Sequence, residues 1–232
     1  MDTIMKKNLI FLLSAALMVL ATGCEKTSKG LTRITYYPVI TLQGDNPYVV
    51  QLGGQYTEPG YTATLNGEDY TDNVQTSSNV DSSVPGIYSV TYSATNPDGC
   101  SYSTTRDVYV LNPGGVANVY ISHCWNNSGS RNYDNIPIVI SPISDGVYEI
   151  EDLLGGYYFA GVYPGYEPTY NFHATVQFSL NEDGTFNVLK IYDWYFKGSF
   201  DYTNITGGYN PETGVFKYNF DGINVALTPF EP

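Results

Sequence analysis

The sequence has few of the residues on which most catalytic and metal sites depend. Its 232 residues include two histidines, His123 and His173, and three cysteines. No serine lies in a G-x-S-x-G elbow, and the adjacent His123 and Cys124 lack the spacing of a zinc site even with His173 as a third ligand. No D-x-D-x-D-G calcium loop occurs either. We therefore expect no catalytic residues, no metal and no cofactor.

Positive charge is also scarce. Ten Lys and Arg residues stand against 23 Asp and Glu, which gives a formal net charge of −13. Without residues 1–23 the chain loses Lys6, Lys7 and Asp2, and its charge becomes −14. Binding to phosphate backbones needs clustered Lys and Arg. The composition therefore argues against a nucleic-acid partner and indicates a self-repelling, soluble surface.

No apolar run is long enough to span a bilayer as a helix, which takes about 20 residues. The longest candidate extends from Leu9 to Ala21, with Lys6 and Lys7 before it and "ATGC" after it. Charged, apolar and small-residue regions in this order are typical of a secretory signal peptide. We assign residues 1–23 to that signal.

Cys24, directly after the expected cleavage site, resembles the last residue of the lipobox of bacterial lipoproteins. The resemblance implies that Cys24 becomes the mature N-terminus, carries acyl chains such as palmitate and anchors the protein in the outer membrane, facing the cell surface or the periplasm. Ala21 stands where Leu is commonest, so cleavage by signal peptidase I remains an alternative. Polar residues 24–35 are predicted to form a tether.

After lipidation only Cys100 and Cys124 remain. An exported pair can form a disulfide. We favour two free buried thiols, because Cys100 lies in the turn "NPDGC" and no feature of the sequence brings it to Cys124.

The remaining chain alternates short runs rich in Val, Tyr, Thr and Ile with turns rich in Gly, Pro, Asn and Asp, which predicts an all-β protein. In "IYSVTYSA" the residues Tyr88, Val90, Tyr92 and Ala94 share one face, and "RDVYVL" repeats the alternation with Val108 and Val110 on one side. Strands at this spacing over residues 36–112 predict an immunoglobulin-like (Ig-like) β-sandwich.

A motif in this region resembles the bacterial surface Ig-like domain, whose members read G-x-x-Y-x-[DE]-P-G, then V-D, P-G-x-Y and V-T-Y. The resemblance covers residues 37–111 and implies a spacer that lifts the rest of the chain off the membrane. The matching residues are Gly53, Tyr56, Glu58-Pro59-Gly60, Val80-Asp81, Pro85-Gly86-Ile87-Tyr88 and Val90-Thr91-Tyr92.

A linker at residues 113–115 leads into a second β-region, residues 116–232, with runs such as "VANVYIS", "ATVQFSL" and "VFKYNF". Connections such as "NEDG" and "NPETG" have hairpin chemistry. They predict an antiparallel meander that forms a second sandwich or a small barrel.

This region is similar to the C-terminal domain of Bacteroidetes surface lipoproteins, in which it follows the Ig-like module. The similarity covers residues 144–232 and rests on "LLGGYY" (Leu153 to Tyr158), Gly165-Tyr166 and Gly208-Tyr209. It implies an accessory of glycan-uptake loci, with an outer-membrane uptake complex as a partner, and transfers no activity.

The stretch "LGGYYFAGVYPGYEPTY", Leu154 to Tyr170, is the main candidate for a binding site. Its first half is predicted to be a strand with Tyr157 and Phe159 on one face. Pro164 and Pro168 then predict a stiff surface loop. Tyrosines on such a loop offer a flat apolar face and a hydroxyl, the combination that sugars need. The candidate ligand-binding residues are Tyr163, Tyr166 and Tyr170, with Trp125 in the predicted loop "HCWNNSGSRNY" and Trp194 in "YDWYFKGSFDY".

An interior position is the alternative for four of these rings, since aromatic side chains fill β-sheet cores. It is favoured for Tyr157, Phe159, Trp194 and Phe196.

Three functions remain open at this point. Glycan binding by a non-catalytic lipoprotein is preferred, with a structural or adhesive subunit that binds a protein partner as the alternative. A hydrolase ranks last, because glycosidases need two carboxylates across the substrate. The nearest pair, Glu149 and Glu151, alternates with Tyr148 and Ile150, which predicts a solvated strand face.

Overall fold

The computed structural model describes residues 34–196 and 198–232. The predicted signal peptide (1–23), the lipidation site Cys24 and residues 24–33 of the tether lie outside the described residues. Within the described part of the chain, no helix has the length and apolar character needed to cross a membrane.

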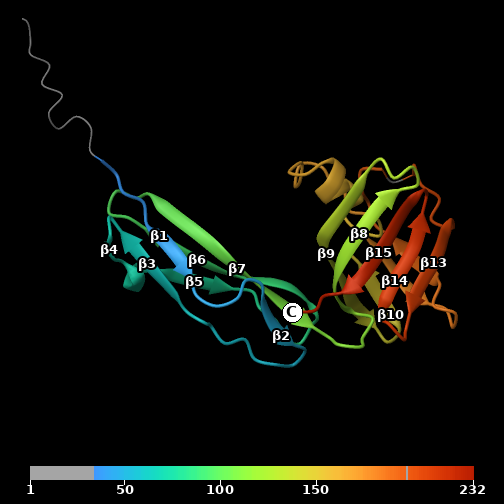
Figure 1. Ribbon diagram of the computed structural model, residues 1–232, viewed down its shortest axis with the longest axis horizontal. Helices are drawn as coiled ribbons and strands as arrows, with labels where there is room; N and C mark the ends of the chain where they lie inside the picture. The colour runs from blue at the N-terminus through green and yellow to red at the C-terminus, as the bar shows by residue number, and fades with distance from the viewer. Residues whose placement is uncertain (1–33, 197) are drawn as a thin grey trace, which may run out of the picture. The chain divides into compact units, whose positions relative to one another are not determined.

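Two sheets form the Ig-like domain, as the sequence predicts (Figure 1). Strands β1 (Val39–Leu42), β3 (Tyr61–Leu65) and β4 (Glu68–Asp69) make the first, in the order β1-β3-β4. The second has the order β2-β7-β6-β5, and only its β2–β7 pair is parallel. Its strands are β2 (Tyr48–Gln51), β5 (Gln75–Ser78), β6 (Gly86–Thr95) and β7 (Ser101–Leu111), and a 3₁₀ turn, η1 (Thr71–Asn73), precedes β5.

Alternate side chains of β6 and β7 point into the core of this domain, as the period-two pattern predicts. Val90, Tyr92 and Ala94 alternate into the core on β6, and Val108 and Val110 join them from β7. The alternation predicted from "IYSVTYSA" and "RDVYVL" is confirmed.

A buried charge, Arg106 on β7, lies in the same core. Its guanidinium donates to the backbone oxygens of Gln43 (2.6 Å) and Asp45, and its Nε donates to the hydroxyl of Tyr92 (3.3 Å). The carboxylate of Glu58 lies 3.6 Å from Nη2 and accepts hydrogen bonds from Tyr92, from the Tyr56 hydroxyl (2.6 Å) and from the Gly60 amide (3.0 Å). The motif residues Tyr56, Glu58, Gly60 and Tyr92 therefore contribute to one network around Arg106.

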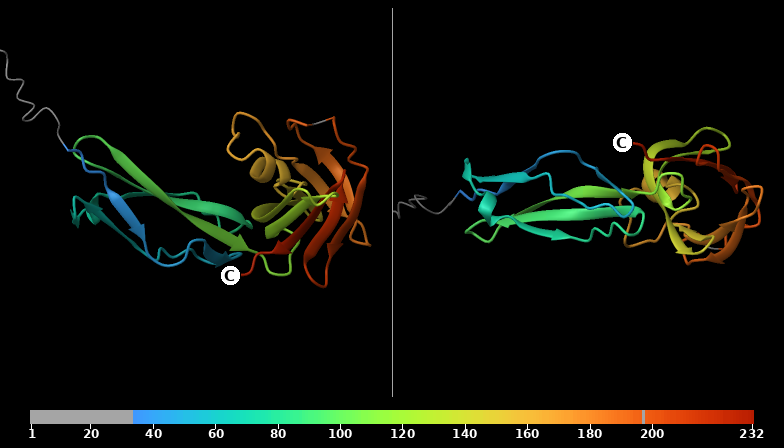
Figure 2. Two further views of the ribbon diagram at one scale, coloured as in Figure 1. Left: turned by 45° about the horizontal axis from the view of Figure 1, so that its top comes forward. Right: turned by 90° about the horizontal axis from the view of Figure 1, so that it is seen from below.

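The C-terminal domain is a single antiparallel sheet of eight strands that curls into a nearly closed barrel (Figure 2, right). Its order, β12-β11-β10-β9-β8-β15-β14-β13, follows the chain around the barrel, and β15 pairs with β8. The predicted meander is therefore confirmed in its barrel form. The strands are β8 (Asn118–Asn126), β9 (Asn132–Ser144), β10 (Val147–Ile150), β11 (Val176–Leu180), β12 (Phe186–Ile191), β13 (Ile205–Asn210), β14 (Val215–Phe220) and β15 (Ile223–Pro229).

The connections of this barrel differ between its two ends. Because neighbouring strands are antiparallel, the connections after β8, β10, β12 and β14 emerge at the same end. Two of them are long, residues 151–175 and residues 192–204, and both are rich in aromatic residues. The topology thus brings two aromatic segments to one rim of the barrel.

The barrel does not close by a regular ladder. The hairpin that leads into β12 meets β13 through the bridge Thr185↔Gly208 and through a hydrogen bond from the Tyr209 amide to the Gly184 carbonyl (2.9 Å). Gly184 has φ +81°, and a Cβ there would overlap the Tyr209 carbonyl oxygen. The seam can close only where residue 184 has no side chain.

Gly184→Ala is therefore expected to destabilise the C-terminal domain by about 2–4 kcal/mol, from positive φ and steric overlap together. Gly146 is the matched control, because its φ is +69° and nothing lies within 4 Å of a Cβ built on it. Gly146→Ala should cost only about 1 kcal/mol. Urea unfolding followed by tryptophan fluorescence measures both, and equal losses would show that the seam contact is unimportant.

Candidate functional site

The connection after β10 begins with a buried carboxylate. Asp152 is buried and accepts hydrogen bonds from the backbone amides of Gly156 (2.6 Å), Ala174 (2.8 Å) and Leu154 (3.3 Å). Leu153 and Leu154 are fully buried in the barrel core. The start and the end of the connection are thus tied to one side chain, and the "LLGG" segment has a structural role.

The segment predicted to be a strand is a short π-helix, η2 (Tyr157–Val162), so the prediction of alternating faces was wrong. Amides bond five residues back, from Gly161 to Gly156 (3.1 Å) and from Tyr163 to Tyr158 (2.8 Å). The reason is topological: β10 pairs directly with β11, which leaves the residues between them no adjacent strand. Gly156 starts the turn with φ +88°, and a Cβ there would lie 2.5 Å from Ile136 Cγ2.

An open pocket of about 210 Å³ follows this helix, and its wall is entirely aromatic. Tyr166 and Tyr170 are 54% and 44% exposed, as their prediction on a loop requires, and Tyr163 is half-buried. Their role in ligand binding stays a prediction. The five lining residues, which we call the aromatic pocket, are Tyr163, Tyr166, Tyr170, Phe172 and Tyr195.

The rings of the aromatic pocket form walls at steep angles. Tyr163 stacks on Phe172, with ring centres 4.7 Å apart and planes at 19°. Tyr166 meets Tyr163 at 71°, and Tyr195 meets Tyr170 at 87°. Because the planes turn toward different directions, the site is a concave pocket and not a flat platform.

Two residues of this pocket were not predicted from the sequence as part of the site. Phe172 forms its floor and is 4% exposed, whereas Tyr195 is 59% exposed and comes from the connection after β12. A hydrogen bond from the Tyr195 amide to the Asn171 carbonyl (2.7 Å) joins the two connections. Continuing the loop past Tyr170 would have included Phe172, but no local pattern brings Tyr195 to it.

Trp194 is buried in the barrel core and is not among the residues that line the pocket, so the structure does not group it with the other candidate ligand-binding residues. It is 6% exposed, stacks on Phe200 at 5.2 Å and meets Phe196 edge-on. The alternative interior position is the one observed for Trp194 and for Tyr157. Phe159 and Phe196 are partly buried against the same core.

A histidine–carboxylate pair supports the loop from behind. His173 stacks on Phe159 with ring centres 3.9 Å apart, and its Nε2 lies 3.0 Å from Glu167 Oε2. The other oxygen of Glu167 accepts the Phe172 amide at 3.2 Å. These contacts fix the backbone that presents Tyr166 and Tyr170, so His173 has a positioning role.

Trp125 was predicted on a loop, but it lies on strand β8, so that prediction was wrong. Its ring lies edge-on to His123 at 4.7 Å, and His123 Nδ1 lies 3.0 Å from Asp134 Oδ1. The ring is half-buried and is not part of the aromatic pocket. The structure thus brings Tyr163, Tyr166 and Tyr170 together and leaves Trp125 apart.

The acidic pair considered for hydrolysis is already engaged by protein groups. Glu149 accepts a hydrogen bond from Gln177 (3.1 Å). Glu151 follows the end of β10, accepts the Val139 amide (2.7 Å) and has its pKa raised to about 7 by burial. The predicted solvated strand face was therefore wrong for Glu151.

The His, Cys, Asp and Glu side chains of the described residues are dispersed, and the two described cysteines are unpaired. No group of three or more His, Cys, Asp or Glu side chains among the described residues could hold a metal ion. Cys100 and Cys124 are free thiols, as favoured, although only Cys124 is buried. Burial raises the pKa of the Cys124 thiol to about 12.

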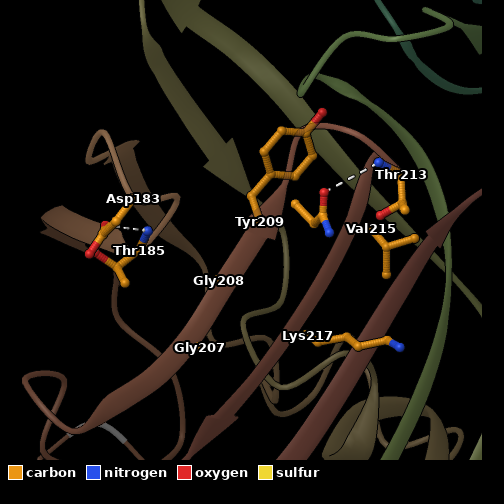
Figure 3. Close-up of a pocket in the computed structure, with 9 residues that line it drawn as sticks. Asp183, Thr185, Gly207, Gly208, Tyr209, Thr213, Val215 and Lys217 are labelled. Atoms are coloured by element: carbon orange, nitrogen blue, oxygen red, sulfur yellow. Dashed lines mark hydrogen bonds between the residues drawn. The ribbon is translucent and has the colours of Figure 1, made fainter.

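A larger cavity of about 470 Å³ lies at the barrel seam (Figure 3). Its wall includes the backbone of Gly207 and Gly208 and a single ring, Tyr209, which packs on Phe216 at 4.7 Å. The Asp183 carboxylate accepts the amide and hydroxyl of Thr185 and is turned to its own hairpin. Lys217 also lines this cavity, but with its acid engaged and its one ring packed the cavity lacks the aromatic wall of the smaller pocket.

Two known domain families match the chain in sequence. The bacterial surface protein Ig-like domain matches residues 40–110. The BT2262-like C-terminal domain matches residues 112–229, about half of the chain.

Among solved structures, the chain is similar to the lipoprotein BT2262 from Bacteroides thetaiotaomicron. The two are 31% identical with a TM-score of 0.60, over 83% of this chain and 100% of that chain. A structure of CBM51-2 in complex with GlcNAc and INT domains, from Clostridium perfringens ZmpB, aligns at 22% identity over 49% of this chain and 28% of that one. Its TM-score of 0.27 supports no conclusion about fold or function. No curated protein matches the chain significantly.

Proposed function

The chain belongs to the family of bacterial surface proteins in which an Ig-like domain precedes a BT2262-like C-terminal domain, and we propose that it is a non-catalytic, glycan-binding lipoprotein. Membership in this family indicates a location in the cell envelope. In our proposal the lipid is attached to Cys24 and the membrane is the outer membrane. The Ig-like domain, residues 36–112, then acts as a spacer that presents the C-terminal domain, residues 116–232.

The aromatic pocket is the observation that carries the binding proposal. Sugars present C–H patches that pack on aromatic faces and hydroxyls that need hydrogen-bond partners, and tyrosine offers both kinds of contact. No hydrogen bond within the described residues occupies the hydroxyls of the four lining tyrosines. Three of them are largely exposed, so both the ring faces and the hydroxyls are accessible.

The size of the pocket sets the expected strength of binding. About 210 Å³ is below the roughly 300–1,000 Å³ typical of sites for drug-sized ligands, so the pocket holds one sugar residue or a group of that size. A single shallow contact binds weakly. Useful retention then comes from repeated units on a polymer and several anchored copies of the protein.

Removal of pocket rings should weaken glycan binding. Tyr166→Ala and Tyr195→Ala are each expected to reduce affinity roughly five- to tenfold, since each removes about 1 kcal/mol of ring contact. Tyr102→Ala is the matched control, because Tyr102 is an exposed tyrosine of the Ig-like domain. Affinity electrophoresis and calorimetry against a polysaccharide panel measure the effect.

A folded chain that no polysaccharide retains would contradict the proposal. The second candidate function, a structural or adhesive subunit, is favoured by the same exposed tyrosines, because tyrosine is enriched at the centres of protein–protein interfaces. In that case mild crosslinking in membranes should yield a protein partner whose recovery falls in Tyr166→Ala, while no glycan binds.

A further inference from the structure

Five aromatic rings line the small volume of the aromatic pocket. The faces of tyrosine and phenylalanine rings carry the negative part of the ring quadrupole, and a cation over them is attracted. Tyr163, Tyr166 and Tyr170 come from one connection and Tyr195 from another, with steep angles of 71° and 87° between neighbouring planes. Tyr163 is stacked on Phe172, so the rings left open to a ligand are those of the exposed Tyr166, Tyr170 and Tyr195.

The net charge of the chain favours the same kind of ligand. None of its five lining residues is basic. Near the pocket, the carboxylate of Glu167 is already engaged by His173 and the Phe172 amide, and Lys190 lies over the ring of Tyr192. Lys197 lies outside the described residues. The whole chain, however, has a formal net charge of −13. A cationic ligand therefore meets attraction both from the rings and from the long-range field of the protein.

The hydroxyl groups of the pocket limit the range of suitable ligands further. Phenolic oxygens accept hydrogen bonds, and the hydroxyls of the four lining tyrosines have no protein partner within the described residues. A primary ammonium group has three N–H donors for them. Neutral sugars use the hydroxyls too but gain less from the ring faces, so an ammonium-bearing sugar uses more of what the pocket offers.

We propose that the aromatic pocket selects a cationic amino sugar, with its free ammonium group held against the tyrosine faces. This inference rests on the proposed function, glycan binding at the same pocket. The volume of about 210 Å³ restricts the pocket to a single residue or group. The ligand is then a polymer or oligosaccharide with free amines, bound one residue at a time.

Two matched probe pairs test the selection. Oligosaccharides of glucosamine are compared with their N-acetylated, neutral counterparts of equal length. Choline is compared with 3,3-dimethylbutan-1-ol, which has the same shape with carbon in place of the charged nitrogen. The charged member of each pair is expected to bind roughly two- to thirtyfold more tightly, the range of measured cation–ring attractions.

Variants separate the pocket from non-specific attraction to an acidic protein. The double variant Tyr166→Ala, Tyr195→Ala keeps the net charge and should lose the preference, whereas Tyr102→Ala should retain it. Tyr166→Phe and Tyr195→Phe keep the ring faces, so they should preserve the choline preference and reduce only glucosamine binding. Circular dichroism confirms that each variant is folded.

The outcomes distinguish this inference from the function on which it rests. Pocket-dependent preference for both charged probes supports it. If neutral glycans bind as tightly as glucosamine oligosaccharides, or more tightly, the inference is refuted but the proposed glycan binding is not. If no sugar binds the folded chain, both the proposed glycan binding and the preference for an amino sugar are refuted. The same conclusion holds if choline binds in the pocket but no sugar does.

Discussion

Replacement of Arg106 by methionine is expected to lower the free energy of unfolding of the Ig-like domain by about 3–5 kcal/mol, the usual cost of removing one partner of a buried ion pair. Arg106 is fully buried. The variant leaves Glu58 without its cation and leaves the backbone oxygens of Gln43 and Asp45 without their donors. Methionine fills part of the space but supplies none of these contacts.

The two tryptophans make this loss measurable by domain. Trp125 and Trp194 both lie in the C-terminal domain, so tryptophan fluorescence reports that domain alone, whereas circular dichroism reports both. In Arg106→Met the unfolding transition of the Ig-like domain, followed by circular dichroism, should shift to lower denaturant concentration, while the fluorescence transition should not shift. Arg131→Met, at an exposed arginine, is the control. An unchanged dichroism transition in Arg106→Met would refute a stabilising role for the network.

At acidic pH the difference in the free energy of unfolding between the wild type and Arg106→Met should become smaller. Burial alone would raise the pKa of Glu58, but hydrogen bonds from Tyr56, Tyr92 and the Gly60 amide and the charge of Arg106 outweigh burial and lower it. An acid with a lowered folded-state pKa stabilises the fold above its unfolded value, about 4.3, and loses that contribution as pH falls toward the folded value. The variant lacks part of this contribution, so its stability should depend less on pH in this range.

Asp152→Ala is expected to have the largest effect on the C-terminal domain, a loss of about 3–5 kcal/mol. Three backbone amides, those of Leu154, Gly156 and Ala174, lose their acceptor inside the protein, and each unsatisfied buried donor costs about 1–3 kcal/mol. We place the total below the full sum because a water molecule can replace part of the lost contact. The tryptophan fluorescence transition should shift, and the Ig-like domain should not respond.

Asp152→Asn is the matched variant for this prediction. The asparagine oxygen can still accept from Leu154 and Ala174, but its amide nitrogen then faces the Gly156 amide, donor against donor. We expect a loss between those of the wild type and Asp152→Ala, together with weaker glycan binding because the connection that carries Tyr166 is loosened. If both variants unfold like the wild type, Asp152 does not hold this connection.

Much of the fold could be predicted because its signals are local. Val90, Tyr92 and Ala94 enter the core as their spacing of two requires, since successive side chains of a strand point to opposite faces. Hairpin residues such as those of "NEDG" and "NPETG" likewise fixed the antiparallel order of neighbouring strands. Prolines on either side of Tyr166 predicted a surface loop, and Tyr166 and Tyr170 are exposed.

The candidate site was only partly predictable, because long-range contacts decide it. Tyr157 to Val162 has the composition of a strand, yet the β10–β11 pair leaves it no partner and it forms a π-helix. Trp194 and Tyr195 are neighbours in the sequence, but Trp194 is buried in the barrel core and Tyr195 lines the pocket. Which of two adjacent rings reaches solvent depends on what packs against each of them.

The sequence by itself determined an acidic, all-β chain with an Ig-like domain first and aromatic segments in the second domain. Composition, periodicity and turn residues act over a few residues and can be read without coordinates. Only the tertiary structure decided that residues 151–175 and 192–204 meet at one rim and that their rings enclose a pocket. The closure of the barrel brings these segments together, and the contacts that close it join residues far apart in the chain.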